Sequence, residues 1–181
     1  ILPKLKIHAV KTGQKAFDWT VPPEWQVSDA WIKSPNGTKL CDFKKNNLHL
    51  VGYSRPIHTK LSREKLIKKL HSLPEMPNAI PYITSYYKSD WGFCIEDNKK
   101  KNLINGTYEI FIKSKLFNGV LNYGELLIKG KTEKEIFLST YICHPSMAND
   151  QLSGICVTTF LAEWINKIKN RKYSYRIVFV P

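Results

Sequence analysis

The residue types that could do chemistry are concentrated in one short turn of the sequence. His144 is followed six residues later by Asp150, and an imidazole nitrogen and a carboxylate oxygen are both good ligands for zinc. A carboxylate has two oxygens, so Asp150 could also bridge two metal ions about 3.5 to 4 Å apart. The spacing is equally typical of a hydrogen-bonded surface pair, and the place of Asp150 just before Leu152 would suit a helix N-cap. From the residues alone, these three interpretations stay open.

The elements around this turn would hold its residues at the end of a sheet. Residues 135–143 form a largely apolar run, of the type found in strands that are buried on both faces. Residues 152–169 carry the broad apolar stripe of a helix packed on a sheet, and residues 175–180 indicate another buried strand. This order predicts a βαβ unit. Ligands of open parallel sheets bind beyond the carboxyl ends of the strands, which is where His144 would emerge.

The middle of the chain indicates a mostly β module with one helix. Turn signals separate short runs rich in β-branched and aromatic residues, at 47–53, 107–112 and 124–128. Residues 62–73 predict the helix, with Ser62 as its N-cap and a proline directly after it.

Cysteine usage and the lack of long apolar runs bear on where the protein resides. None of the four cysteines lies in a C-x-x-C spacing, and we expect Cys143 and Cys156 to be buried because both lie in apolar runs. Such thiols are typical of a reduced, cytoplasmic protein. No apolar run approaches the roughly 18 to 20 residues that span a bilayer, and the first residues do not resemble a signal peptide. The sequence therefore predicts a cytoplasmic location and no membrane partner.

The chain is strongly basic, with 28 Lys plus Arg against 15 Asp plus Glu and a formal charge of +13. Only four of the cations are Arg, the residue that reads phosphates and bases in bidentate fashion. The lysines are scattered along the chain. This pattern favours a solvated surface over a nucleic-acid interface, and we expect no nucleic-acid partner.

Two stretches around the turn resemble a known metal motif. Residues 139–144 (STYICH) and 148–154 (ANDQLSG) are similar to the first metal motif of the co-catalytic di-zinc aminopeptidases. In that family, a strand ends in a metal-binding His and an Ala-Asp-Asp-Asn-x-Ser-Gly loop supplies a bridging Asp before a helix. The second acid of that loop corresponds to Asp150.

The resemblance to a narrower group covers the chain from about Lys6 to Pro181. It is similar to aminopeptidase-like proteins that are often encoded among bacterial polysaccharide-biosynthesis genes, in which a β domain of unknown function is inserted into the peptidase-like fold. The stretches that carry this similarity are 17–22 (FDWTVP), 80–87 (IPYITSYY), 91–94 (WGFC) and 143–149 (CHPSMAN).

The sequence departs from the zinc family at three points. Ser146 stands where the family has an Asp that helps to organise the metal-binding His. Asn149 replaces the first acid of the Asp-Asp pair. The family's catalytic Glu follows a buried strand like residues 175–180, so it would fall just beyond Pro181, and the other metal ligands would come later still. The chain is therefore interpreted as a fragment that lacks the general base.

The resemblance implies an α/β fold that is part of a three-layer zinc-aminopeptidase-like sheet domain with a β-rich inserted domain. Residues 1–31 and 131–181 would form the discontinuous sheet domain, incomplete at its C-terminal end. Residues 32–130 would form the insert, which we expect to have a core of its own and to lie near the mouth of the site.

The function implied is that of the N-terminal portion of a zinc-dependent aminopeptidase-like hydrolase, incomplete and inactive as it stands. His144 and Asp150 would be its metal ligands. The complete fold would hold two zinc ions and act on a peptide or amino-acyl substrate, whereas these 181 residues alone would bind zinc weakly or not at all. The alternative is a non-catalytic binding or scaffold homologue in surface-polysaccharide biosynthesis. The oligomeric state stays open.

Overall fold

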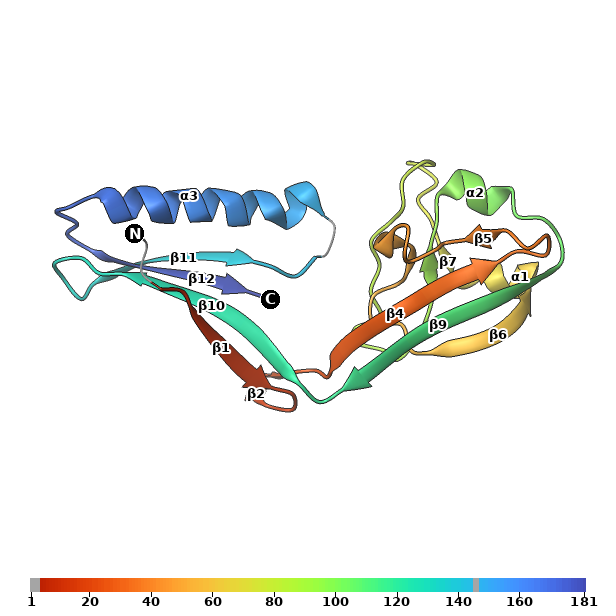
Figure 1. Cartoon of the computed structure of the whole chain (residues 1–181), viewed down its shortest axis with the longest axis horizontal. Helices are drawn as coiled ribbons and strands as arrows, with labels where there is room; N and C mark the ends of the chain where they lie inside the picture. Colours follow the sequence, from red (N-terminus) through yellow and green to blue (C-terminus); the bar gives the residue numbers. More distant parts are fainter. Residues whose placement is uncertain (1–3, 145–146) are drawn as a thin grey trace. The chain divides into compact units, whose positions relative to one another are not determined.

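The computed structural model describes residues 4–144 and 147–181, and the chain divides into two compact units (Figure 1). Unit 1 consists of Ile1–Glu24 and Asn118–Pro181, and unit 2 consists of Trp25–Phe117. Each unit is described by itself.

Unit 1 is built on a four-stranded sheet with the order β1-β10-β12-β11. Strand β1 (Lys6–Lys11) is antiparallel to β10 (Val120–Ile128), which is antiparallel to β12 (Ser174–Val180). Strand β11 (Glu135–Tyr141) runs parallel to β12 along its whole length. Helix α3 (Ser153–Lys167) connects these two strands and lies along one face of the sheet (Figure 1). The strand, helix and strand predicted around the turn are thus present.

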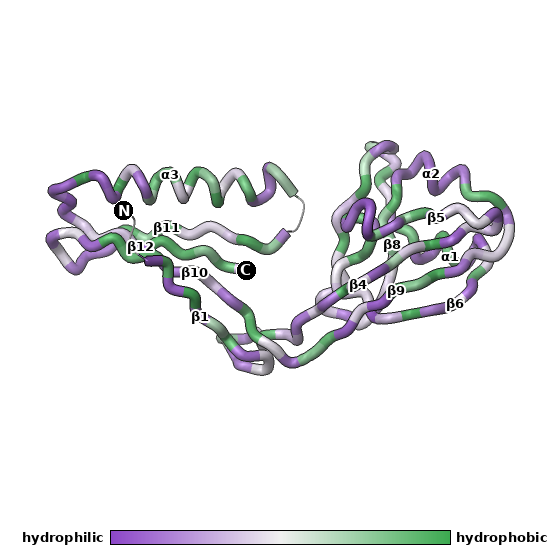
Figure 2. Tube along the Cα trace, viewed as in Figure 1, coloured by the Kyte–Doolittle hydropathy of each residue, from purple (hydrophilic) through white to green (hydrophobic). Residues whose placement is uncertain are grey.

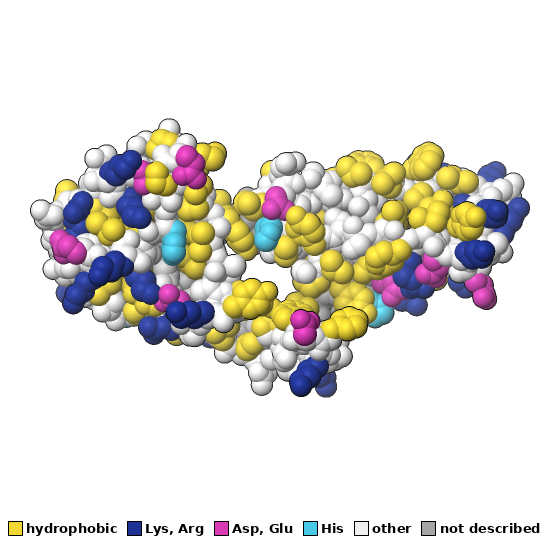
Figure 3. Space-filling model, turned by 180° about the vertical axis from the view of Figure 1, so that it is seen from behind, with side chains coloured by type: hydrophobic (Ala, Val, Ile, Leu, Met, Phe, Trp, Pro, Cys, Tyr) yellow, Lys and Arg dark blue, Asp and Glu magenta, His cyan; other side chains and the backbone are white. Residues whose placement is uncertain are grey.

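A small core holds α3 against this sheet. It consists of two helix residues, Ala162 and Ile165, and three strand residues, Leu126, Ile128 and Ile177. Hydrophobic and hydrophilic residues are mixed along the helix (Figure 2), and much of the visible surface of unit 1 is hydrophobic (Figure 3). A short hairpin, β2 (Lys15–Ala16) with β3 (Trp19–Thr20), completes the unit.

Strand β11 differs from the expectation that it is buried on both faces. It is the edge strand of the described sheet, and Phe137 is 61% exposed. Cys143 and Cys156, which we expected to be buried, are both exposed as well. The apolar run indicated how much surface the strand could bury. As an edge strand, however, β11 has a neighbouring strand on one side only, and several of its side chains stay exposed to solvent beside α3.

The boundaries between the units also differ from those expected at residues 31 and 131. Strand β10 lies inside the sheet of unit 1, between β1 and β12, although the sequence assigned its residues to the insert. Residues 118 and 119, an Asn-Gly pair, are one of the turn signals within the predicted β module. In the structure they lie where the chain passes from β9 (Thr107–Phe117) of unit 2 into unit 1. Apolar residues lie on both sides of this point, at Leu116, Phe117, Val120 and Leu121, so composition does not mark it as a boundary.

Unit 2 contains a second four-stranded sheet with the order β5-β4-β9-β6. Its other strands are β4 (Glu24–Lys33), β5 (Lys39–Leu40) and β6 (Ile57–Ser62). The remaining elements are the parallel pair β7 (Leu70–His71) and β8 (Phe93–Cys94), the short helices α1 (Arg63–Ile67) and α2 (Asp97–Lys101), and a 3-10 turn at Asn47–His49.

The core of unit 2 is much larger than that of unit 1. Its buried members come from the sheet, from α1, from the β7–β8 pair and from the segments between these elements: Ala30, Ile32, Cys41, Leu50, Leu66, Leu70, Trp91, Phe93, Ile95, Leu103, Tyr108, Ile110 and Ile112.

Helix α1 is shorter than the predicted helix at 62–73. Ser62 occupies the N-cap position, but its side chain makes no capping hydrogen bond. The helix stops because the following residues pair as a strand: the Phe93 N–H donates to the Lys69 carbonyl at 2.9 Å, and the Ile95 N–H donates to the His71 carbonyl at 3.0 Å. Leu70, expected on the helix stripe, is buried through β7 instead.

Candidate functional site

The turn that carries the predicted site lies at the carboxyl end of β11. Tyr141 is the last residue of the strand and is paired with Val180 of β12. The Ile142 N–H donates to the Val180 carbonyl at 2.6 Å, so the chain stays beside β12 as it leaves the sheet. After the turn, the segment Ala148–Leu152 forms a wide, kinked helical turn that leads into α3, and Asp150 and Gln151 within it have non-helical backbone angles. Ser146, where the family has an Asp, lies outside the described residues.

The structure brings the two predicted side chains together. His144 Nε2 and Asp150 Oδ2 are 3.8 Å apart, and the side chains are 29% and 48% exposed. The pair is therefore reachable from solvent and is held at the end of the sheet where ligands of such folds bind.

Tyr141, which the sequence analysis did not single out, contacts both members of this pair. Its hydroxyl donates a short hydrogen bond to Asp150 Oδ1. Its ring meets the His144 ring edge to face, with the centroids 6.0 Å apart and an angle of 77° between the planes. The hydrogen bond to Asp150 raises the pKa of the Tyr141 hydroxyl, because it stabilises the protonated phenol. The one signal that the sequence offered for Tyr141 was its place in the predicted strand, three residues before His144.

Gln151 is the second residue that sequence reasoning missed. Its Oε1 accepts hydrogen bonds from the backbone N–H groups of Cys143 and His144, the latter at 2.7 Å. Its Nε2 donates to the His144 carbonyl at 2.8 Å. One side-chain amide thus satisfies three backbone groups and ties the end of the strand to the start of the helical turn.

The helix-cap interpretation of Asp150 finds no support in these contacts. Neither the wide turn nor α3 has a side-chain capping hydrogen bond at its start. The first turn of α3 lies in close contact with β11, because a Cβ added to Gly154 would lie only 2.7 Å from Thr140 Oγ1. At Asn149, the backbone carbonyl accepts from the Ser153 hydroxyl at 2.5 Å. The carboxylate of Asp150 is thus left to face Tyr141 and His144.

The pair fits part of a zinc site. Two ligands of one tetrahedral zinc, each about 2.0 to 2.1 Å from the ion, lie about 3.3 Å apart, so the observed 3.8 Å requires only a small closing movement. Within residues 4–144 and 147–181, no group of three or more His, Cys, Asp or Glu side chains could hold a metal ion. An ion bound by this pair alone would keep most of its coordination to water.

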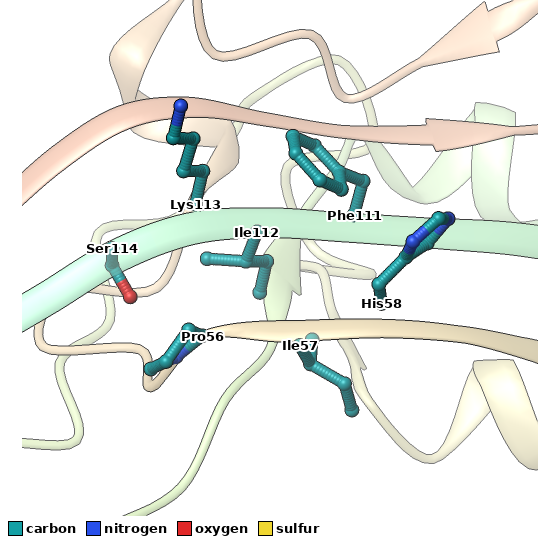
Figure 4. Close-up of a pocket in the computed structure, with 7 residues that line it drawn as sticks. All are labelled: Pro56, Ile57, His58, Phe111, Ile112, Lys113 and Ser114. Atoms are coloured by element: carbon teal, nitrogen blue, oxygen red, sulfur yellow. The ribbon is translucent and has the colours of Figure 1, made fainter.

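No other feature of the described chain competes with this site on chemical grounds. A shallow hollow of about 560 Å³ lies at the paired strands β6 and β9 of unit 2, lined by residues 56–58 and 111–114 (Figure 4). His58, which lines it, is 62% exposed, and its Nε2 lies 2.8 Å from Oε1 of Glu109 outside the hollow. Among the described helices, none has the length and apolar character needed to cross a membrane.

Comparisons with known proteins place the chain among relatives of this type. The family model described as a domain of unknown function, DUF4910, matches residues 1–181. A Clostridium acetobutylicum protein, named for polysaccharide biosynthesis and an aminopeptidase-like domain, is 50% identical over 177 residues, which cover 98% of this chain and 41% of that protein. The chain therefore spans well under half the length of this relative.

Solved structures agree with this likeness. A crystal structure of a candidate peptidase from C. acetobutylicum has a TM-score of 0.93 and 49% identity, and the match covers 98% of this chain and 42% of that one. A zinc aminopeptidase from Bacillus subtilis has a TM-score of 0.59 at 12% identity, with 97% and 50% covered. The second likeness concerns the fold alone. The resemblance to aminopeptidase-like proteins of polysaccharide biosynthesis, predicted from the motifs, is confirmed.

Proposed function

Because the chain belongs to the DUF4910 family, we propose that it forms the N-terminal portion of a zinc-dependent aminopeptidase-like hydrolase, and that it is inactive by itself. The observation that carries this proposal is the convergence of His144 and Asp150 at the carboxyl end of β11. The fold likeness to a zinc aminopeptidase supports it. The further ligands and the general base would come from the additional length that the C. acetobutylicum relative has.

Each residue of the pair has a separate role in this proposal. His144 offers the Nε2 atom as a neutral nitrogen ligand, and Asp150 offers carboxylate oxygens whose charge compensates that of the cations. When bound, zinc polarises a peptide carbonyl and lowers the pKa of a bound water. Tyr141 leaves Asp150 able to bridge, because a carboxylate oxygen that accepts one hydrogen bond keeps a second lone pair.

The substrate in this proposal is a peptide or an amino-acyl compound, and the protein is cytoplasmic. Unit 2 would be a module inserted into the sheet domain, since its residues 25–117 interrupt the two segments that build unit 1. These parts of the proposal rest on the family resemblance and on the division of the chain.

The test uses a version of the protein extended beyond residue 181 to the length of the C. acetobutylicum relative, called the extended protein below. Asp150→Asn keeps the shape of the side chain but replaces an anionic oxygen pair with a neutral amide. We expect zinc content to fall at least about tenfold in competition with a chelator, because a bridge between cations loses its charge. Without zinc, the thermal stability of the variant should differ little from that of the unmodified protein, since the Tyr141 hydroxyl can still donate to the amide oxygen.

The matched control is Asp42→Asn in unit 2. Within the described residues, the hydrogen bond that its carboxylate accepts comes from the Lys44 N–H, at 3.1 Å. It should leave zinc content unchanged. Unchanged zinc content in Asp150→Asn would remove Asp150 from the site and contradict the proposal.

A second candidate is a non-catalytic binding or scaffold protein in surface-polysaccharide biosynthesis. The observation that favours it is the relative named for polysaccharide biosynthesis, together with a described donor set of only two side chains. An extended protein that binds no zinc in the chelator competition would favour this candidate over the hydrolase.

A further inference from the structure

The His144–Asp150 pair is held by two side chains that are not themselves metal donors in the proposed site. Tyr141 approaches from β11 and Gln151 from the wide helical turn, so the support comes from both sides of the turn. Both contact the pair or its backbone directly.

Tyr141 limits the freedom of both donors. A carboxylate on an exposed turn can rotate about its last torsion, but the Tyr141 hydroxyl holds Oδ1 of Asp150 and leaves Oδ2 turned toward His144. The same ring lies edge to face with the imidazole and restricts its rotation. Tyr141 is 43% exposed, so this hydrogen bond adds little to the stability of the fold.

Gln151 controls the backbone from which His144 projects. Its amide accepts from two successive N–H groups and donates to the His144 carbonyl. Because Gln151 directly follows Asp150 in the chain, the same residue sets the distance between the two donors. The polypeptide around His144 is thus anchored to the residue next to its partner.

We infer that Tyr141 and Gln151 are positioning residues of the metal site: Tyr141 orients the Asp150 carboxylate, and Gln151 fixes the separation of His144 and Asp150. This inference rests on the proposed function. Groups that orient metal ligands commonly contribute about tenfold to a hundredfold to metal affinity without touching the ion.

Tyr141→Phe in the extended protein tests the first role, because it removes the hydroxyl and keeps the ring. We expect zinc affinity, measured against a chromophoric chelator, to fall about tenfold. With Co²⁺ in place of zinc, the visible absorption spectrum should change, since it reports the geometry of the ligands. The control is Tyr87→Phe, at a 90% exposed tyrosine of unit 2, which should alter neither measurement.

Gln151→Met tests the second role, because it keeps the length of the side chain and removes all three hydrogen bonds. We expect a comparable loss of zinc affinity. Hydrogen exchange at the backbone amides of Cys143 and His144 should accelerate, since both lose their acceptor. Gln26→Met, at an exposed position of β4, is the control and should leave affinity and exchange unchanged.

The outcomes separate this inference from the proposed function. If the unmodified extended protein binds zinc, and both variants bind it equally well with an unchanged Co²⁺ spectrum, the positioning roles are wrong and the proposed function survives. An unmodified extended protein that binds no zinc would overturn both.

Discussion

The two units differ in how completely they bury their hydrophobic side chains. Unit 2 surrounds a core of thirteen buried residues, whereas the core of unit 1 contains five. In unit 1, Phe160 and Trp164 of α3 are 72% and 63% exposed, and Phe137 of β11 is 61% exposed. Exposed apolar side chains that form a contiguous patch are typical of surfaces that other protein covers. Unit 2 thus buries its hydrophobic side chains more completely than unit 1 does.

The candidate site lies in the less completely packed unit. His144 and Asp150 follow an edge strand, and both side chains reach solvent. In the proposed function, this pair would need further metal ligands, and further protein would cover the exposed apolar side chains of unit 1.

The largest effect is expected in the core of unit 2. Phe93 is fully buried, so Phe93→Ala should lower the free energy of unfolding of this unit by about 3 to 5 kcal/mol, through lost burial and a cavity. Urea denaturation followed by tryptophan fluorescence, to which the buried Trp91 of this unit contributes, measures it. Phe93→Leu, which leaves a smaller cavity, should cost clearly less. A loss below about 1 kcal/mol for the alanine variant would contradict the assigned packing.

Thiol reactivity should divide the cysteines by unit. Cys41 and Cys94 are buried in unit 2, and burial raises the pKa of Cys94 to about 11 and also raises that of Cys41. Cys143 and Cys156 of unit 1 are exposed. Because the thiolate is the reactive form, we expect the two unit 2 thiols to be labelled at least about a hundredfold more slowly. Mass spectrometry of the labelled peptides identifies them, and four equal rates would refute the division.

A smaller effect concerns an ion-pair network across the sheet of unit 1. Arg176 of β12 contacts Glu125 of β10 and forms two bonds, of 2.6 and 2.7 Å, with Glu135 of β11. Its hydrogen bonds lower the pKa of Glu135. A lowered folded-state pKa contributes stability above the ordinary glutamate pKa of about 4.3, and this stability is lost as the pH falls through the lowered value.

Arg176→Met should therefore lower the melting temperature of unit 1 at pH 7 and have much less effect near pH 3. Thermal unfolding of both proteins across this range measures the difference. Lys167→Met, which removes an exposed pair with Glu163 at 3.2 Å, is the control and should have little effect at either pH. An equal loss for Arg176→Met at both pH values would show that the side chain acts by packing and not by charge.

The smallest effect is expected for Phe160→Ala. It is the same exchange of Phe for Ala as Phe93→Ala in unit 2, but it is made at an exposed position of α3. In the 181-residue chain it should change the free energy of unfolding by less than about 0.5 kcal/mol, because little area is lost and alanine favours the helix. In the extended protein the same change should cost more if further protein covers α3. A large cost in the short chain would break the contrast between the units.

Several local features were predictable from the sequence because they depend on neighbours along the chain. The apolar run before the turn, the helical stripe after it and the next apolar run correspond to β11, α3 and β12. The closeness of His144 and Asp150 followed from their place in the connecting turn. Tyr141 and Gln151 were not predicted, because their roles depend on the direction of single hydrogen bonds, which no spacing rule encodes.

Composition and periodicity by themselves determined which segments could form strands and helices and which turn carried the donor pair. Only the tertiary structure decided which strands have neighbours. It made β11 an edge and exposed Cys143, it placed β10 in the sheet of unit 1, and it ended α1 where Leu70 pairs beside Phe93. The physical reason is that the hydrophobicity of a segment determines how much free energy its burial contributes. Which partner buries the segment depends on contacts between residues that are distant in the sequence.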